Sequence, residues 1–195
     1  RQAGADAATL ATVFAASGAD GHNCHALCEQ LASADRQISP TRFHNSVHNA
    51  AAGYWGIATG SMAPCQVIGA FDAGFGAGLL DALAQVALSR RPVLLLAYDG
   101  EYPEPLHAKR DTPDCAGVAL LFEPERGANA LAALRVSPTA EPGATMRDAG
   151  LEALRCAIPA LRALPLLELL ANARAGVVSL DYLPPMQLLA EVEPC

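Results

Sequence analysis

The chain has 195 residues, enough to bury a substantial core, and 52% of them are hydrophobic but only 5% are aromatic. We therefore expect a core built from Ala, Leu and Val. The formal net charge of -7 argues against a nucleic-acid-binding protein, because such proteins usually carry a basic face.

The sequence predicts neither a signal peptide nor a membrane span. Asp6 interrupts the first apolar stretch, and the first residue is not Met, which leaves open whether a native segment precedes it. The richest apolar stretch, 157–178, is broken by three charged residues. Six cysteines spread along the chain favour free thiols in a cytoplasmic protein over a disulfide scaffold.

The first third of the chain predicts a strand, two helices and a second strand. The apolar run 10–17 predicts a buried strand closed by a Gly-containing turn. Apolar residues at helical spacing predict helices over 22–33 and 43–59. A turn then leads into a short strand over 65–69.

The middle of the chain predicts a Gly-rich helix followed by a central strand. The helix is expected over 73–88 and contains Gly74, Gly76 and Gly78. Because each Gly inside a helix costs about 1 kcal/mol relative to Ala, three of them indicate that something approaches the backbone closely. The run 92–98 (PVLLLAY) predicts a strand covered on both faces. We interpret the acids of the following loop as a solvated surface (Asp99, Glu101, Asp111 and Asp114).

The last part of the chain predicts further strands and helices. Strands are expected over 116–122 and 131–136, helices over 146–157 and 159–173, and a strand over 177–180. Strands that alternate with helices indicate an α/β protein with helices on the faces of a mixed sheet.

Two groups of side chains raise the question of a metal site. His44 and His48 stand four apart on the predicted helix 43–59, but residue 45 is Asn where a zinc protease needs Glu. The cluster His22, Cys24, His25 and Cys28 has no second pair downstream. We therefore predict no metal, and the sequence also contains no Gly-x-Ser-x-Gly elbow.

The segment 39–60, SPTRFHNSVHNAAAGYWGIATG, carries a resemblance to a known family. It contains Ser39-Pro40, then Asn49, Ala52-Gly53 and Gly60, and Pro64 follows. This pattern resembles the segment before the nucleophile in β-ketoacyl synthases. The order of elements over 10–138 also resembles the N-terminal half of the thiolase fold. The resemblance implies a single thiolase-like domain over 1–195, a mixed sheet with helices on both faces, and an open assignment for 139–195.

The resemblance also implies where a nucleophile belongs. Ketosynthases place a Cys where a strand turns into an Ala/Gly-rich helix, whose N-terminus lowers the thiol pKa and holds an oxyanion. Here that corner falls on 70–72, with Asp72 as the preferred equivalent of the Cys. An Asp there is a poor acyl acceptor, and its simplest structural role is a helix N-cap. We interpret Cys65, one strand earlier, as a core thiol.

The family's two catalytic His come from the C-terminal half, and no His follows Pro138, so we predict no catalytic residue. The pattern resembles the short chain-length-factor members of the family, such as those of aryl polyene clusters. This implies a non-catalytic subunit that pairs with an active ketosynthase, without a cofactor, and shapes the tunnel for chains bound to an acyl carrier protein. Tyr54, Phe71 and Phe75 are our candidates for lining that tunnel or the subunit interface.

Two other functions stay open at this point. The chain is an autonomous acyltransferase or hydrolase if Asp72, His44 or His48 works with a Cys. Alternatively, it is a ketosynthase remnant with a purely structural role.

Overall fold

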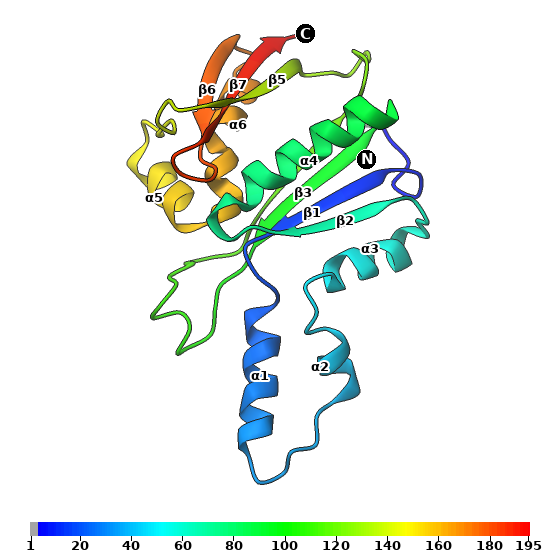
Figure 1. Ribbon diagram of the computed structural model, residues 1–195, viewed down its shortest axis with the longest axis vertical. Helices are drawn as coiled ribbons and strands as arrows, with labels where there is room; N and C mark the ends of the chain where they lie inside the picture. Colours follow the sequence, from blue (N-terminus) through cyan, green and yellow to red (C-terminus); the bar gives the residue numbers. More distant parts are fainter. Residues whose placement is uncertain (1–3) are drawn as a thin grey trace.

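The computed structural model describes residues 4–195 as two sheets with a long helix between them (Figure 1). The first sheet has the order β2-β1-β3-β4 and comprises β1 (Ala11–Ala16), β2 (Cys65–Gly69), β3 (Val93–Asp99) and β4 (Ala116–Phe122). β1 pairs in parallel with β2 and β3, whereas β4 is antiparallel to β3. The second sheet, of order β5-β7-β6, is antiparallel and comprises β5 (Ala132–Thr139), β6 (Gly176–Leu180) and β7 (Gln187–Pro194).

The helix α4 (Gly74–Ser89) lies between the two sheets because its glycines let both sheets approach. A Cβ built on Gly78 would lie 2.8 Å from Ala15 and Leu95 of the first sheet. A Cβ on Gly76 would lie 2.9 Å from Tyr182, two residues after the end of β6. Both distances are shorter than side chains tolerate, so the close approach expected from the Gly-rich sequence is confirmed.

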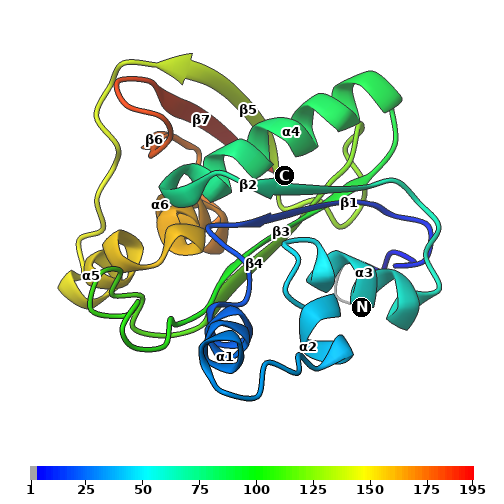
Figure 2. The ribbon, with the colours of Figure 1, turned by 60° about the horizontal axis from the view of Figure 1, so that its bottom comes forward.

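The two faces of the first sheet are covered by different helices. Val13 of β1 and Leu95 of β3 point toward α4 and are fully buried. On the opposite face, Phe14 packs edge-to-face against Trp55 of α3 (Ala50–Thr59), with ring centroids 6.1 Å apart. Figure 2 shows α3 and α4 on opposite sides of this sheet. The expected α/β class and mixed sheet with helices on both faces are confirmed.

Two further helices project from the body of the protein (Figure 1). α1 (Gly21–Ala32) begins at Asp20, whose side chain accepts a hydrogen bond from the Asn23 N–H. α2 (Pro40–His44) begins at Ser39 in the same way. Both starts follow the preference for Asp and Ser at the N-cap.

The predicted helix 43–59 is confirmed only over Ala50–Thr59, because the chain breaks between α2 and α3. α2 ends at His44 with Asn45 as its C-cap, and the Ser46 hydroxyl donates to the Phe43 carbonyl. Asn and Ser side chains compete for backbone partners in this way and so disfavour helix interiors. His44 and His48 therefore do not share a helical face.

The predicted helix 159–173 is also divided, into a 3₁₀ helix (Pro159–Ala163) and α6 (Leu164–Ala171). Pro165 has no N–H and would clash inside a continuous helix, but it fits the first turn of α6. α5 (Ala149–Ala157) starts three residues later than predicted, at the cap Asp148.

The strand β7 was not predicted at all. Its buried residues alternate with more exposed ones: Leu188, Ala190 and Val192 face the core, whereas Glu191 and Glu193 are exposed. This is the period of two that a half-buried strand shows.

The stretch Phe71–Ser89, which includes α4, is long and apolar enough by length and composition to cross a membrane, with a mean hydropathy of 1.2. The sequence interpretation did not recognise it. In the fold this stretch lies between the sheets with Phe75 and Leu79 fully buried, a position that accounts for its apolar character. It is therefore weak evidence for a membrane span.

Candidate functional site

The corner between β2 and α4 has a strained backbone. A short 3₁₀ turn, Phe71–Ala73, connects the strand to the helix. Phe71 has a φ of 50°, which is the left-handed region, and it is 61% exposed. A bulky residue with positive φ is uncommon and strained. The positive φ at this corner therefore belongs to Phe71, one residue before Asp72.

Asp72 is held by two arginines from distant parts of the chain. Arg110, from the loop after β3, donates to its Oδ1 at 2.8 Å, and Arg162, from the 3₁₀ helix before α6, lies 3.9 Å from its Oδ2. The expected N-cap role of Asp72 is wrong, because neither the 3₁₀ turn nor α4 has a side-chain cap. The carboxylate instead serves as the shared partner of two guanidinium groups.

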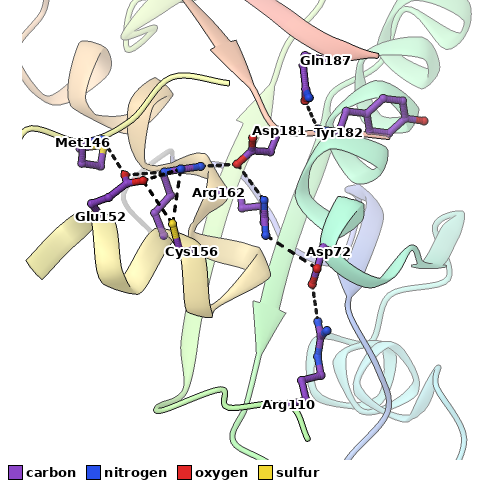
Figure 3. A network of polar contacts seen from close by, with 10 residues as sticks. Asp72, Arg110, Met146, Glu152, Cys156, Arg162, Asp181, Tyr182 and Gln187 are labelled. Carbon is purple, nitrogen blue, oxygen red and sulfur yellow. Dashed lines mark hydrogen bonds and ion pairs between the residues drawn. The ribbon is translucent and has the colours of Figure 1, made fainter. Parts of the chain in front are cut away.

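These ion pairs continue into a longer network (Figure 3). Arg162 also donates to Asp181 at 2.9 Å, and Asp181 accepts a second hydrogen bond from Arg155. Arg155 donates to both oxygens of Glu152, at 2.7 and 2.8 Å. The network thus joins the β2–α4 corner to α5 and to the loop between β6 and β7.

The largest pKa shifts in this network belong to Glu152 and Arg155, which lie at the end far from Asp72. The hydrogen bonds from Arg155, and then the Met146 N–H, lower the pKa of Glu152 from 4.5 to about 2. The pKa of Arg155 is raised, first by its hydrogen bonds to Glu152. The Cys156 thiol next to them has a raised pKa, chiefly because burial disfavours the thiolate and because it donates to Glu152. A raised thiol pKa leaves less of the nucleophilic thiolate at neutral pH.

Two cavities lie on the side of the first sheet that faces away from α4. The first, of about 700 Å³, lies at the carboxyl ends of β1 and β3 and is lined by His48, Tyr54 and Glu101, among others. The second, of about 350 Å³, lies beside α3 and is lined by Phe14, Trp55 and Leu96, among others. Sequence reasoning did not find either cavity, because their walls come from segments far apart in the chain.

The predicted site residues do not all lie at one place in the structure. Tyr54 lines the first cavity, is half exposed and donates to Asn45 Oδ1 at 2.9 Å. Phe71 and Asp72 lie together at the corner. Phe75 is 1% exposed in the core and lines neither cavity, so the structure gives it a packing role and a role in a tunnel stays a prediction.

Two other interpretations of individual residues were wrong. Asp99 is not on a solvated surface: it is 8% exposed and accepts hydrogen bonds from the N–H groups of Ser17 and Ala160, at 2.8 and 2.7 Å. Cys65 is exposed rather than a core thiol.

The structure brings His48 close to the end of β2 and gathers no metal ligands around it within residues 4–195. The imidazole of His48 lies against Gly69 at the end of β2, and its Nε2 is buried without a hydrogen-bond partner among residues 4–195. Within the same residues, no three His, Cys, Asp or Glu side chains gather to form a metal site.

Both the sequence and the fold of this chain resemble those of known proteins. Residues 2–168 match the family model described as β-ketoacyl synthase, N-terminal domain. The fold resembles a solved complex of a ketosynthase (ApeO) with its chain length factor (ApeC) from Xenorhabdus doucetiae, at 22% identity and a TM-score of 0.69, over 94% of this chain and 69% of that one. It also resembles the ishigamide ketosynthase/chain length factor, at 15% identity and a TM-score of 0.70, over 96% and 73% of the two chains. No curated protein sequence matches. The chain therefore belongs to the β-ketoacyl synthase family, through its N-terminal domain, and has the thiolase-like ketosynthase fold.

Proposed function

We propose that this chain is a non-catalytic chain-length-factor subunit that pairs with an active β-ketoacyl-acyl-carrier-protein synthase. The observation that carries the proposal is the corner at the N-terminus of α4. Its residues are Phe71 and Asp72, and Asp72 forms ion pairs with Arg110 and Arg162. A carboxylate held in this way is a poor acyl acceptor, so the reacting thiolate is expected on the partner. Two of the similar solved structures are described as a ketosynthase with a chain length factor.

The exposed edge of the first sheet supports a partner subunit. β2 is an edge strand, and Cys65 and Gln66 at its start are exposed. Next to it, Ile57, Met62 and Phe71 are 78%, 96% and 61% exposed. An uncovered edge with large apolar side chains around it is typical of an interaction surface. We place the ketosynthase partner on this surface, called the β2 edge below.

We also propose that the subunit acts on chains carried by an acyl carrier protein and that it works in the cytoplasm. Tyr54 and Phe71 remain our candidates for contact with the chain or the partner. All six cysteines are unpaired in the structure, which fits a reducing compartment.

Co-expression with an active ketosynthase from the same organism tests the proposal. Affinity purification followed by size-exclusion chromatography is expected to yield a stable one-to-one complex. The double variant Ile57→Asp/Met62→Asp is expected to abolish it, whereas Leu131→Asp, at an exposed apolar residue before β5, is expected to leave it intact. A ketosynthase that never co-purifies with the wild-type chain contradicts the proposal.

The hydrolase alternative has less support from the geometry. Asp72 is paired with arginines rather than with His44 or His48, and Cys156 has a raised pKa. Turnover of acyl thioesters by the isolated chain would nevertheless establish it.

A further inference from the structure

The helix α5 presents its apolar residues to the solvent and its charged residues to the protein. Arg155 is 6% exposed and Glu152 is partly buried, whereas Leu151 and Leu154 are 41% and 36% exposed. A surface helix of a soluble protein usually has the opposite arrangement, with its apolar stripe against the core. The exposed residues of α5 are all uncharged: Ala149, Gly150, Leu151, Ala153, Leu154 and Cys156. An apolar helix face in this position is typical of an interaction surface.

The inward polar contacts of α5 fix this orientation. Arg155 donates hydrogen bonds to both Glu152 oxygens and to Asp181. The Met146 N–H donates to Glu152 at 2.8 Å. Rotating α5 to bury its two leucines would break these bonds and leave charged groups without partners, which is strongly destabilising inside a protein. A second molecule that covers the face removes the leucines from water while every one of these bonds is kept.

The composition of the exposed face suits another copy of the same helix. Leu151 and Leu154 are neighbours on the helix surface, because residues three apart lie on one side. Gly150 and Ala153 next to them have little or no side chain, so a second helix can approach closely. Two copies related by a two-fold axis bring the same patch together, so the patch has to be complementary to itself. An uncharged apolar face meets this condition because no like charges are opposed.

The charges at the two ends of α5 favour an antiparallel pair of helices. Arg147, just before the helix, is exposed and has no ion-pair partner within residues 4–195. In an antiparallel pair it lies next to the C-terminal end of the other helix, where the last carbonyls carry the negative end of the helix dipole. A charged helix of another protein would instead lose the hydration of its side chains against this face without gaining partners for them.

We propose that α5 is a contact between two copies of this chain, in which the two α5 helices pack antiparallel about a two-fold axis with Leu151 and Leu154 at its centre. The helix has only nine residues, so the contact is smaller than a standard stable interface and the association is reversible. The contact uses none of the residues of the β2 edge. A complex with the ketosynthase is therefore expected to contain two copies of each subunit at high concentration.

Sedimentation of the purified full chain over a wide range of micromolar concentrations tests the contact. The wild type is expected to pass from monomer to dimer as the concentration rises. Leu154→Glu is expected to weaken dimerisation by about a hundred-fold or more, because the two-fold axis introduces the change twice and each copy loses the burial of a leucine. Leu88→Glu is the matched control, since Leu88 is 86% exposed on another helix, α4. Ala153→Glu replaces Leu154→Glu if that variant does not fold.

A chain that stays monomeric at every concentration overturns the proposal, and so does a dimer that Leu154→Glu and Ala153→Glu leave intact. A dimer that is lost in Ile57→Asp/Met62→Asp but kept in Leu154→Glu assigns self-association to the β2 edge and also overturns it. If the wild type alone is monomeric and Leu154→Glu abolishes the ketosynthase complex, the ketosynthase covers α5 and a second copy does not.

These results are separable from failure of the proposed function, because the dimer is measured on the chain alone. A monomeric chain that still forms the ketosynthase complex rejects the α5 contact and leaves the proposed function standing. A dimer that depends on Leu154 but never binds a ketosynthase supports the contact and rejects the proposed function.

Discussion

The guanidinium of Arg110 lies 3.7 Å from the centre of the Phe71 ring and at the same time donates to Asp72. One side chain from the loop after β3 thus contacts both unusual residues of the β2–α4 corner. The Asp72 carboxylate is half exposed, so this ion pair contributes little to stability, and the cation–π contact adds about 0.5–1 kcal/mol. Its main effect is to hold the loop against the corner.

Arg110→Gln is accordingly expected to loosen the loop more than it destabilises the fold. The free energy of unfolding should fall by about 1 kcal/mol or less. Amide hydrogen exchange over residues 100–114 should become faster. Lys109→Gln is the control, because Lys109 is exposed and has no ion pair among the described residues. Equal exchange rates in the two variants would contradict the role of Arg110.

The strain at Phe71 is testable by comparing two truncations of its side chain. Both Phe71→Ala and Phe71→Gly remove the ring and the contact with Arg110, but only Gly adopts a φ of 50° at no steric cost. Phe71→Gly is therefore expected to be more stable than Phe71→Ala by about 1 kcal/mol, measured by urea unfolding. An equal or lower stability of Phe71→Gly would mean that this backbone conformation is not strained.

The sequence predicts the elements around α4 well and the network around Asp72 poorly, for a physical reason. β2 and β4 have the predicted bounds, because continuous apolar runs next to turn residues are local signals. The partners of Asp72 lie 38 and 90 residues away in the chain, and no local pattern relates them. The walls of the two cavities are equally non-local, since α3, β3 and β4 all contribute to them.

The effect on stability of replacing a glycine by alanine is expected to depend on the space around that glycine. Gly78→Ala places a methyl group 2.8 Å from Ala15 and Leu95, so it should destabilise the fold by about 1–3 kcal/mol. Gly53→Ala in α3 is the matched control: a Cβ there meets no atom within 4 Å, and the change should stabilise the helix by up to about 1 kcal/mol. Thermal unfolding of the two variants should therefore shift in opposite directions.

Glu152 is expected to make the fold sensitive to acid. Because Arg155 and the Met146 N–H lower its pKa from 4.5 to about 2, the folded state binds its proton less tightly than the unfolded state does. Its stabilising contribution is thus fully present above about pH 4.5 and is lost as the pH falls to about 2. Glu152→Gln should be less stable than the wild type at neutral pH, with a difference that shrinks over this range.

Urea unfolding midpoints of the wild type and Glu152→Gln between neutral pH and pH 2 measure this difference. Glu168→Gln is the control, because Glu168 is exposed on α6 and has no ion-pair partner within residues 4–195. Its difference from the wild type should stay small throughout. If the Glu152→Gln difference is the same at neutral and acidic pH, the bonds from Arg155 do not stabilise the ionised carboxylate, and the network at the β2–α4 corner ends at Asp181.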